Sequence, residues 1–242
     1  MKHALVTGGS RGIGRAICLK LSEMGYNVII NYVSRDEEAL AVQNTIVERG
    51  GTAELLKFDV TDRKACTAAI EGWQNQHPED YIEVVINNAG IRRDNLLVWM
   101  EAEDWDKVLG IGLNGFYNVT HSLLLAMLKH RKGRIINMAS LSGLRGVPGQ
   151  CNYSATKGGL IAATRSLAGE VAKKGVTVNA IAPGFIRTEM TDGLNEAELK
   201  KLIPTGRFGE AEEVAELVAF LVSDKASYIT GECISINGGL YV

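Results

Sequence analysis

Two side chains suited to proton transfer, Tyr153 and Lys157, stand four residues apart inside a stretch with helical periodicity. Residues at i and i+4 share one face of an α-helix, so the phenol and the ammonium would lie together. A phenol with a pKa of about 10 exchanges protons poorly at neutral pH, and a neighbouring cation favours its ionised form. The pair could therefore protonate the alkoxide that forms when a hydride reaches a carbonyl carbon.

A serine that could hold the substrate oxygen lies upstream, at Ser140, just after a β-branched run that ends at Met138. Ser142 follows two residues later and is an alternative for the same role. A tyrosine and a lysine four apart are common on solvated helices, so the pattern depends on its context.

A glycine-rich segment near the N-terminus indicates a nucleotide site. It follows the apolar strand pattern at 4–6 and leads into a helical pattern that begins near residue 13. Glycines let the backbone approach a pyrophosphate, and the helix presents free N–H groups to the anion. This context disfavours the alternative of a simple turn. The expected contacts are Gly8, Ser10, Arg11, Gly12, Ile13 and Gly14.

The end of the second predicted strand lacks the acidic residue that binds the adenosine ribose of NAD,. Asp36 is close by, but Ser34 and Glu37 fit a capping box, which places Asp36 in the first helical turn. Arg11 and Arg35 can pair with a 2′-phosphate. The sequence therefore predicts NADP(H) rather than NAD(H). The expected contacts here are Asn31, Tyr32, Ser34 and Arg35.

Polar residues also end the third and fourth predicted strands, at the edge where such sheets bind ligands. Asp59 could accept a hydrogen bond from the adenine amino group. Asp59 and Asn87 are equally well explained as turn residues that cap the following segments. The expected cofactor contacts at these strand ends are Asp59, Val60, Asn87, Ala89 and Gly90.

The whole chain alternates between strand and helix patterns, which predicts an α/β fold. Strands are expected at 4–6, 27–32, 53–58, 82–86, 134–138, 176–181 and 233–236. Helices are expected at 13–24, 36–49, 62–76, 103–130, 152–174 and 210–222. We expect a single-domain, doubly wound Rossmann fold over 1–242, with a seven-stranded parallel sheet and helices on both faces. Residues 184–207 have no clear period and are a candidate substrate lid.

Composition argues against several classes of function. The chain has 26 basic and 28 acidic residues, a formal net charge of −2 and no long single-sign run, so we expect no nucleic-acid or membrane partner,. Its four cysteines have no metal-ligand spacing, and no metal site is expected,. The sequence shows no signal peptide or bilayer-spanning run, and we expect a cytoplasmic location.

The motifs, in this order, resemble those of the short-chain dehydrogenase/reductase family along essentially the whole chain: residues 7–14, residues 87–90, Ser140, Tyr153 with Lys157, and Pro183-Gly184. The resemblance implies a catalytic tetrad of Asn114, Ser140, Tyr153 and Lys157. In it, Asn114 would kink its helix and hold a water in a proton relay to Lys157. From the residues alone, Asn114 is simply a polar residue between Gly112 and Gly115, which weaken the helix,. The resemblance also implies a nicotinamide loop formed by Pro183, Gly184, Ile186 and Thr188.

Within the family, residues 90–97, 152–157, 228–232 and 237–239 are most similar to the members that reduce 3-oxoacyl groups on acyl carrier protein. This implies NADPH-dependent reduction to 3-hydroxyacyl thioesters in fatty-acid synthesis, a homotetramer, and carrier-protein docking at Arg131 and Lys174. Those two residues are equally well explained as solvated helix ends. Arg92 and Trp99 are bulkier than the residues common there, which leaves the substrate open.

Two alternatives remain at this point. The same chemistry could act on another ketone, such as acetoacetyl-CoA, a sugar or a polyol. A protein that binds NADP without turnover is a different class, but it would be expected to lose Ser140, Tyr153 or Lys157, and all three are present.

Overall fold

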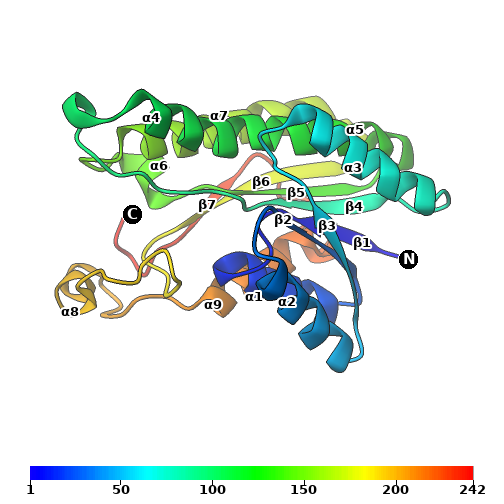
Figure 1. Ribbon diagram of the computed structural model, residues 1–242, viewed down its shortest axis with the longest axis horizontal. Helices are drawn as coiled ribbons and strands as arrows, with labels where there is room; N and C mark the ends of the chain where they lie inside the picture. The colour runs from blue at the N-terminus through cyan, green and yellow to red at the C-terminus, as the bar shows by residue number, and fades with distance from the viewer. Residues whose placement is uncertain (242) are drawn as a thin grey trace.

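Seven parallel strands form one sheet in the computed structural model, which describes residues 1–241 (Figure 1). Residue 242, the end of the range expected for the domain, lies outside the described residues. The sheet order is β3-β2-β1-β4-β5-β6-β7. The strands are β1 His3–Val6, β2 Asn27–Tyr32, β3 Thr52–Lys57, β4 Ile82–Asn87, β5 Gly133–Met138, β6 Val176–Pro183 and β7 Cys233–Ile236. The predicted doubly wound sheet is confirmed, and its strand order reverses between β1 and β4, where such sheets bind ligands.

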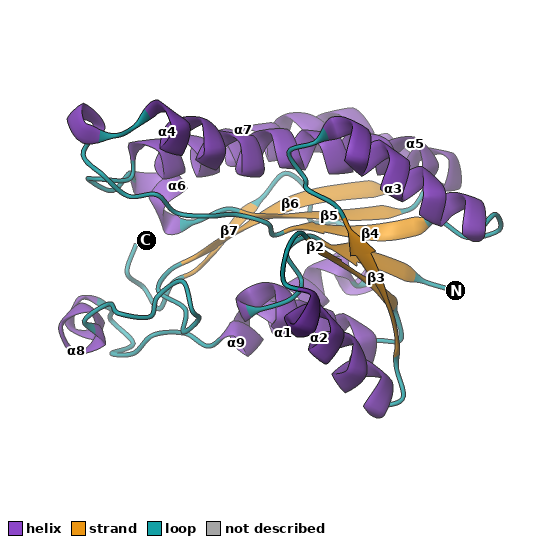
Figure 2. Ribbon diagram, in the orientation of Figure 1, coloured by secondary structure: helices purple, strands orange, loops and turns teal. Residues whose placement is uncertain are grey.

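Helices cover both faces of this sheet (Figure 2). One layer contains α1 Gly12–Glu23, α2 Asp36–Glu48 and α9 Ala211–Val222; the other contains α3 Arg63–Gln76, α4 Ala102–Leu109, α5 Gly115–His130, α6 Leu141–Arg145 and α7 Cys151–Val171. Successive strand residues point to opposite faces. Val6 accordingly packs in the core with α1 and α9, whereas Leu5 packs in the core with α3 and α5. No helix in residues 1–241 is both long and apolar enough to cross a membrane.

The predicted helix at 103–130 is one helical run with an irregular centre. Between α4 and α5, residues Gly110–Asn114 form a π-helical segment. The glycine content favours this irregular segment locally, because only proline has a lower helix propensity than glycine. Gly112 and Gly115 are both buried, and a side chain at Gly115 would press on Val60. The segment therefore brings the helix backbone close to its neighbours.

The capping box expected at Ser34 and Glu37 is wrong. Helix α2 begins one residue later, with Arg35 as its N-cap, and no side chain caps it. Asp36 does lie in the first turn, as predicted, where acidic residues complement the helix dipole,. The structure has its capping box at the start of α9 instead, between Glu210 and Glu213.

Residues 184–207, the candidate lid, extend beside the C-terminal edge of the sheet and contain a short helix, α8 Glu196–Leu199, and a 3-10 turn, Lys200–Leu202 (Figure 1). Arg187 fastens this segment at two points. Its guanidinium donates to Glu196 at 2.6 Å and also pairs with Glu210 at the start of α9.

Candidate active site

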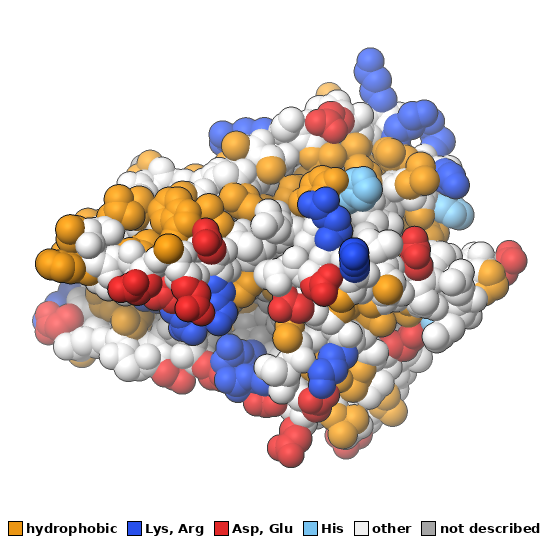
Figure 3. All heavy atoms as spheres, turned by 45° about the horizontal axis from the view of Figure 1, so that its top comes forward, with side chains coloured by type: hydrophobic (Ala, Val, Ile, Leu, Met, Phe, Trp, Pro, Cys, Tyr) orange, Lys and Arg blue, Asp and Glu red, His pale blue; other side chains and the backbone are white. Residues whose placement is uncertain are grey.

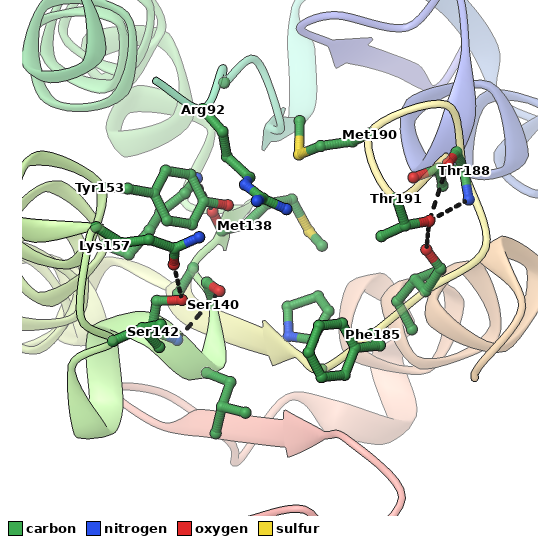
Figure 4. A pocket seen from close by; sticks show the side chains of 18 of the residues that line it. Arg92, Met138, Ser140, Ser142, Tyr153, Lys157, Phe185, Thr188, Met190 and Thr191 are labelled. Carbon is green, nitrogen blue, oxygen red and sulfur yellow. Dashed lines mark hydrogen bonds between the residues drawn. The ribbon is translucent and has the colours of Figure 1, made fainter. Parts of the chain in front are cut away.

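A cavity of about 320 Å³ opens at the carboxyl ends of β4, β5 and β6 (Figure 4). This volume lies at the lower end of the range for small-molecule sites. Nine of the predicted catalytic and cofactor-binding residues line it: Ile13, Gly90, Ser140, Tyr153, Lys157, Pro183, Gly184, Ile186 and Thr188. The cavity thus joins the predicted nucleotide end to the predicted reactive end.

Tyr153 and Lys157 project from the same face of α7, as their spacing predicted. The Lys157 ammonium lies 5.5 Å from the centre of the Tyr153 ring. Its Nζ donates a hydrogen bond of 2.6 Å to the backbone oxygen of Met138, at the end of β5. Lys157 is only 4% exposed, and burial lowers its pKa to about 8. A buried amine with so low a pKa is still mostly charged at neutral pH.

The pKa of Tyr153 is raised, mainly because burial disfavours the phenolate. A hydrogen bond with Ser140 and the charge of Arg92 lower it, while Asp94 raises it. The sequence predicts that Lys157 lowers this pKa, but Lys157 is not among the groups that shift it. In the ligand-free chain, desolvation outweighs the opposing effects, so the phenol keeps its proton.

Ser140 is better placed than Ser142 to contact a substrate. Ser140 is the N-cap of α6, and its Oγ accepts a hydrogen bond of 3.2 Å from the Ser142 backbone N–H. The Ser142 hydroxyl donates to Gln150 Oε1 at 2.8 Å. Its proton is therefore already committed, whereas Ser140 is directed toward Tyr153.

Asn114, the fourth member of the predicted tetrad, does not line the cavity. It is the exposed last residue of the π-helical segment and is not among the residues that line the cavity. Gly112, two residues earlier, is buried, and a Cβ atom there would overlap the methyl carbon of Thr156. Gly112 therefore packs against α7 at Thr156, the residue before Lys157. The proton relay that the resemblance implies for Asn114 stays a prediction.

Gly112→Ala is expected to destabilise the protein by about 1–3 kcal/mol, because the new methyl group would collide with Thr156. Thr156→Ser removes the colliding methyl and keeps the hydroxyl that bonds to Asn152 O. In that background the same Gly112→Ala change should cost little, since alanine favours helix by about 1 kcal/mol over glycine. Urea unfolding of the four proteins of this double-mutant cycle measures the coupling. Equal costs in both backgrounds would contradict the close contact.

The glycine loop fits a dinucleotide pyrophosphate. Gly8 and Gly12 have positive φ angles of 62° and 50°, which favour glycine, and a Cβ at Gly14 would overlap the Gly8 oxygen,. The loop ends at the N-terminus of α1, whose first N–H groups have no intrahelical partner,. These features allow an anion to approach the backbone closely.

Asn88 is a functional residue that the sequence analysis missed. Its Nδ2 donates to the backbone oxygens of Thr7 at 2.8 Å and Gly8 at 3.1 Å, so it anchors the glycine loop to the end of β4. It also lines the cavity. The neighbouring Asn87 had been singled out instead. Strand alternation could have identified Asn88, because residues of opposite parity point to opposite faces.

Several predicted cofactor contacts have structural roles as well. Asn31 Nδ2 donates to Phe58 O at 3.0 Å, which ties β2 to the end of β3. Asn87 Nδ2 donates to Asn137 Oδ1 at 2.8 Å in the core. Asp59 Oδ1 accepts bonds of 2.8 Å from both the N–H and the hydroxyl of Thr61, which is a turn geometry,. Val60, 3% exposed, and Ala89 pack in the core beneath the loop.

Charged side chains gather near the end of β2. Asp36 is occupied, because it accepts bonds from Tyr32 at 3.1 Å and from Lys57 at 2.8 Å. Arg11 pairs at 2.5 Å with a single oxygen of Glu189, a residue of the candidate lid, and Arg35 lies 3.7 Å from that oxygen. Ser34 is exposed beside them. The two arginines that could take a 2′-phosphate thus already converge on a carboxylate.

Arg131 and Lys174 lie together but away from the cavity. Arg131 Nη2 donates to the Lys173 oxygen at 3.1 Å. Both residues precede their strands, β5 and β6, whereas the cavity lies where those strands end. A six-residue strand such as β5 separates the two edges by about 20 Å,. A partner bound to this pair would not face the cavity of the same chain.

No cluster of His, Cys, Asp and Glu within residues 1–241 could hold a metal ion.

Comparison with known proteins gives one family and many relatives. A family model described as enoyl-(acyl carrier protein) reductase matches residues 8–241. A Staphylococcus aureus protein named 3-oxoacyl-[acyl-carrier-protein] reductase FabG is 47% identical, over 100% of this chain and 98% of its own length. Proteins with the same reductase name from Aggregatibacter actinomycetemcomitans (45% identical, 98% of each chain) and Synechocystis sp. (44% identical, 98% of this chain and 96% of its own) are also similar.

Proposed function

The chain belongs to the short-chain dehydrogenase/reductase family, and on that premise we propose that it reduces 3-oxoacyl thioesters on acyl carrier protein to 3-hydroxyacyl thioesters in fatty-acid synthesis, with NADPH as reductant. One observation carries the proposal: Ser140, Tyr153 and Lys157 converge in the cavity that the glycine-loop residue Ile13 also lines. Full-length similarity to relatives named for this reaction supports the substrate class.

Each reactive residue has a distinct task in the proposed reaction. When bound, the reduced nicotinamide supplies a hydride for the carbonyl carbon. Ser140 donates a hydrogen bond to the carbonyl oxygen, and Tyr153 transfers its phenolic proton to that oxygen. The raised pKa of Tyr153 keeps the proton in place until negative charge develops on the substrate,. Lys157 then stabilises the phenolate, because its ammonium lies within 5.5 Å of the ring centre,.

The cavity wall favours an acyl group over a sugar or polyol. Apolar side chains of Met138, Phe185, Met190 and Leu194 line it. They would leave several hydroxyl groups of a polyol without hydrogen-bond partners, and each such group costs about 1–3 kcal/mol. An acyl chain has no such requirement.

Steady-state oxidation of NADPH tests the proposed function. Acetoacetyl and crotonyl thioesters should be compared, each on acyl carrier protein and on coenzyme A. We expect turnover of the acetoacetyl thioesters and none of the crotonyl thioesters, since the site is built to protonate a carbonyl oxygen. Turnover of crotonyl thioesters alone would mean a C=C reductase, as the description of the matching family model suggests, and would refute the proposal.

Glu189→Gln is expected to tighten NADPH binding about three- to tenfold while leaving NADH unchanged. The 2′-phosphate must replace the Glu189 carboxylate at Arg11 and Arg35, and removing an exposed pair of this kind changes the free energy by about 1 kcal/mol,. Fluorescence titration with both cofactors gives the two dissociation constants. Glu198→Gln, a lid carboxylate paired only with Lys201, is the matched control. Equal tightening of NADH, or comparable affinities of the wild type for the two cofactors, would contradict the NADP assignment.

Reversing both charges, Arg131→Glu with Lys174→Glu, tests docking of the acidic carrier protein, which at this position would have to serve the cavity of another subunit of the homotetramer proposed below. Reversal of the two charges should raise KM for the acetoacetyl thioester of the carrier protein severalfold and leave KM for acetoacetyl-CoA unchanged. The two substrates share the reacting group, so the CoA ester is an internal control. Equal effects on both would show that these residues do not dock a carrier.

A homotetramer in the cytoplasm completes the proposal. Leu125 on α5 is 63% exposed, as expected for an interface, whereas Leu123 and Met127 on the same helix belong to the core of the chain. Trp99 is 68% exposed, and Figure 3 shows apolar side chains gathered on the visible face among mixed acidic and basic ones. Sedimentation of the purified protein measures the assembly.

The cysteines agree with the proposed cytoplasmic location. All four are free thiols, as is usual for cytoplasmic proteins,.

A further inference from the structure

Arg92 places a cation in the cavity, which Arg145 and Lys157 also line. The residue belongs to the loop after β4, and its guanidinium points into the cavity between Tyr153 and Met190 (Figure 4). The side chain is 27% exposed. The reaction as derived above gives this charge no task.

One side of the Arg92 guanidinium is hydrogen-bonded to Asp94, and the other side faces the cavity. Its Nε and Nη2 groups both donate to a single oxygen, Oδ2 of Asp94. The Nη1 group makes no hydrogen bond within the described residues 1–241. Arg92 can therefore offer two N–H donors to a ligand without giving up its bond to Asp94.

A chain of hydrogen bonds connects this cation to Ser140. The same Asp94 oxygen accepts a bond of 2.8 Å from Gln150 Nε2, and Gln150 Oε1 accepts one of 2.8 Å from the Ser142 hydroxyl. The Ser142 N–H in turn donates to Ser140 Oγ at 3.2 Å. The first three links join side chains, and the last is donated by a backbone N–H. The position of the guanidinium is therefore fixed relative to the serine that holds the ketone.

We propose that Arg92 is a specificity-determining residue that donates to the thioester carbonyl oxygen while Ser140 and Tyr153 hold the ketone oxygen. The inference rests on the proposed function, since a 3-oxoacyl thioester carries two carbonyl groups separated by one carbon. The Arg92 guanidinium and the Tyr153 phenol lie beside one another in the cavity (Figure 4), so both carbonyl sites would lie in the same part of it, and the charge of Arg92 lowers the pKa of Tyr153. Without Arg92, the second carbonyl would lose a charged donor, and a site built around such a bond rejects a ketone that lacks the partner.

Arg92→Met tests the inference with two small substrates. One is the N-acetylcysteamine thioester of acetoacetate, and the other is its thioether analogue, in which a methylene group replaces the thioester carbonyl. A hydrogen bond to a charged donor is worth about 1.5–3 kcal/mol, so kcat/KM for the thioester should fall about ten- to one-hundredfold. For the thioether it should change less than about threefold. Arg92→Lys, which keeps a donor cation, should recover part of the lost activity.

The outcomes separate the inference from the proposed function. If the wild type reduces the thioester but Arg92→Met loses the same factor on both substrates, the residue acts through Tyr153 or the fold, and the inference is wrong. If the wild type reduces neither substrate, the proposed function fails and the inference falls with it. If Arg92→Met does not fold, Arg92→Lys is used instead, and its kcat/KM for the thioester is divided by its kcat/KM for the thioether. A ratio equal to that of the wild type, with reduced activity on both substrates, would refute selective binding.

Discussion

Tyr153→Phe lowers kcat/KM for acetoacetyl thioester by about three orders of magnitude, because general acid catalysis by a positioned side chain contributes about 10²–10⁴. The substitution removes one oxygen atom and leaves the ring in its half-buried place on α7. NADPH should still bind with an affinity within a few fold of wild type. Stopped assays with high enzyme concentration measure the residual rate, and fluorescence titration measures cofactor binding.

Tyr228→Phe provides the matched control for this experiment. Tyr228 is fully exposed, so losing its hydroxyl should change neither turnover nor stability. Full turnover by Tyr153→Phe with intact NADPH binding would refute Tyr153 as the proton donor. Loss of both turnover and NADPH binding would indicate damage to the site rather than loss of the proton donor. The Ser140→Ala protein would then be tested: a low turnover with intact NADPH affinity would show that the site can lose catalysis without losing the cofactor.

The fold was predictable because the pattern that encodes it is local. Strand residues such as Val84, Val85 and Ile86 are all buried between two helix layers, which produces continuous apolar runs rather than alternation,. The pairing of Tyr153 with Lys157 was predictable for the same reason, since both lie within one regular helix. In each case the backbone geometry follows directly from the spacing.

Asn114 could not be placed from the sequence because the helix around it is not regular. A π-helical turn contains about one residue more than an α-helical turn and therefore rotates the following residues away from the expected face. Over Gly110–Asn114 this rotation leaves Asn114 exposed and turns Gly112 toward Thr156. Whether a glycine-rich helix adopts this turn depends on what packs against it, and that is set by residues distant in the chain.

Arg92 illustrates a second limit. Its role depends on Asp94, two residues away, but also on Ser142 in α6 and Gln150 at the start of α7, which lie at least fifty residues later. Such a network exists only after the sheet brings the ends of β4 and β5 together. The sequence showed that Arg92 was unusual but gave no partner for it.

Lys157→Met is expected to abolish most turnover and at the same time to stabilise the protein at pH 7. The catalytic loss should be about 10²–10⁴, as for other residues that act on a transferred proton. The gain in stability follows from burial: taking the ammonium out of water lowers the pKa of Lys157 from 10.5 to about 8. That shift corresponds to a penalty of about 3 kcal/mol for the charged form. Methionine has no charge, but it also loses the bond to Met138, so a net gain of about 1–2 kcal/mol is expected,.

The pH dependence identifies the cause of this gain. Below pH 8 the lysine is protonated in both the folded and the unfolded wild type, and the full penalty applies. Between about pH 8 and the ordinary value of 10.5, the unfolded chain holds more protons than the folded one, so wild-type stability rises with pH,. The advantage of Lys157→Met should therefore shrink over this interval, as measured by urea unfolding at several pH values. Lys174→Met, at an exposed position, should show no such trend.

Wild-type turnover should decline over the same pH range, because a neutral Lys157 no longer stabilises the Tyr153 phenolate. The two measurements report one titration by different means, the first through folding and the second through catalysis. A stability gap that stays constant from pH 7 to pH 10 would show that the amine is not held as a buried charge. The proposed role of Lys157 would then lose its physical basis, since the cation that costs stability is the same one that makes a phenol an effective acid at neutral pH.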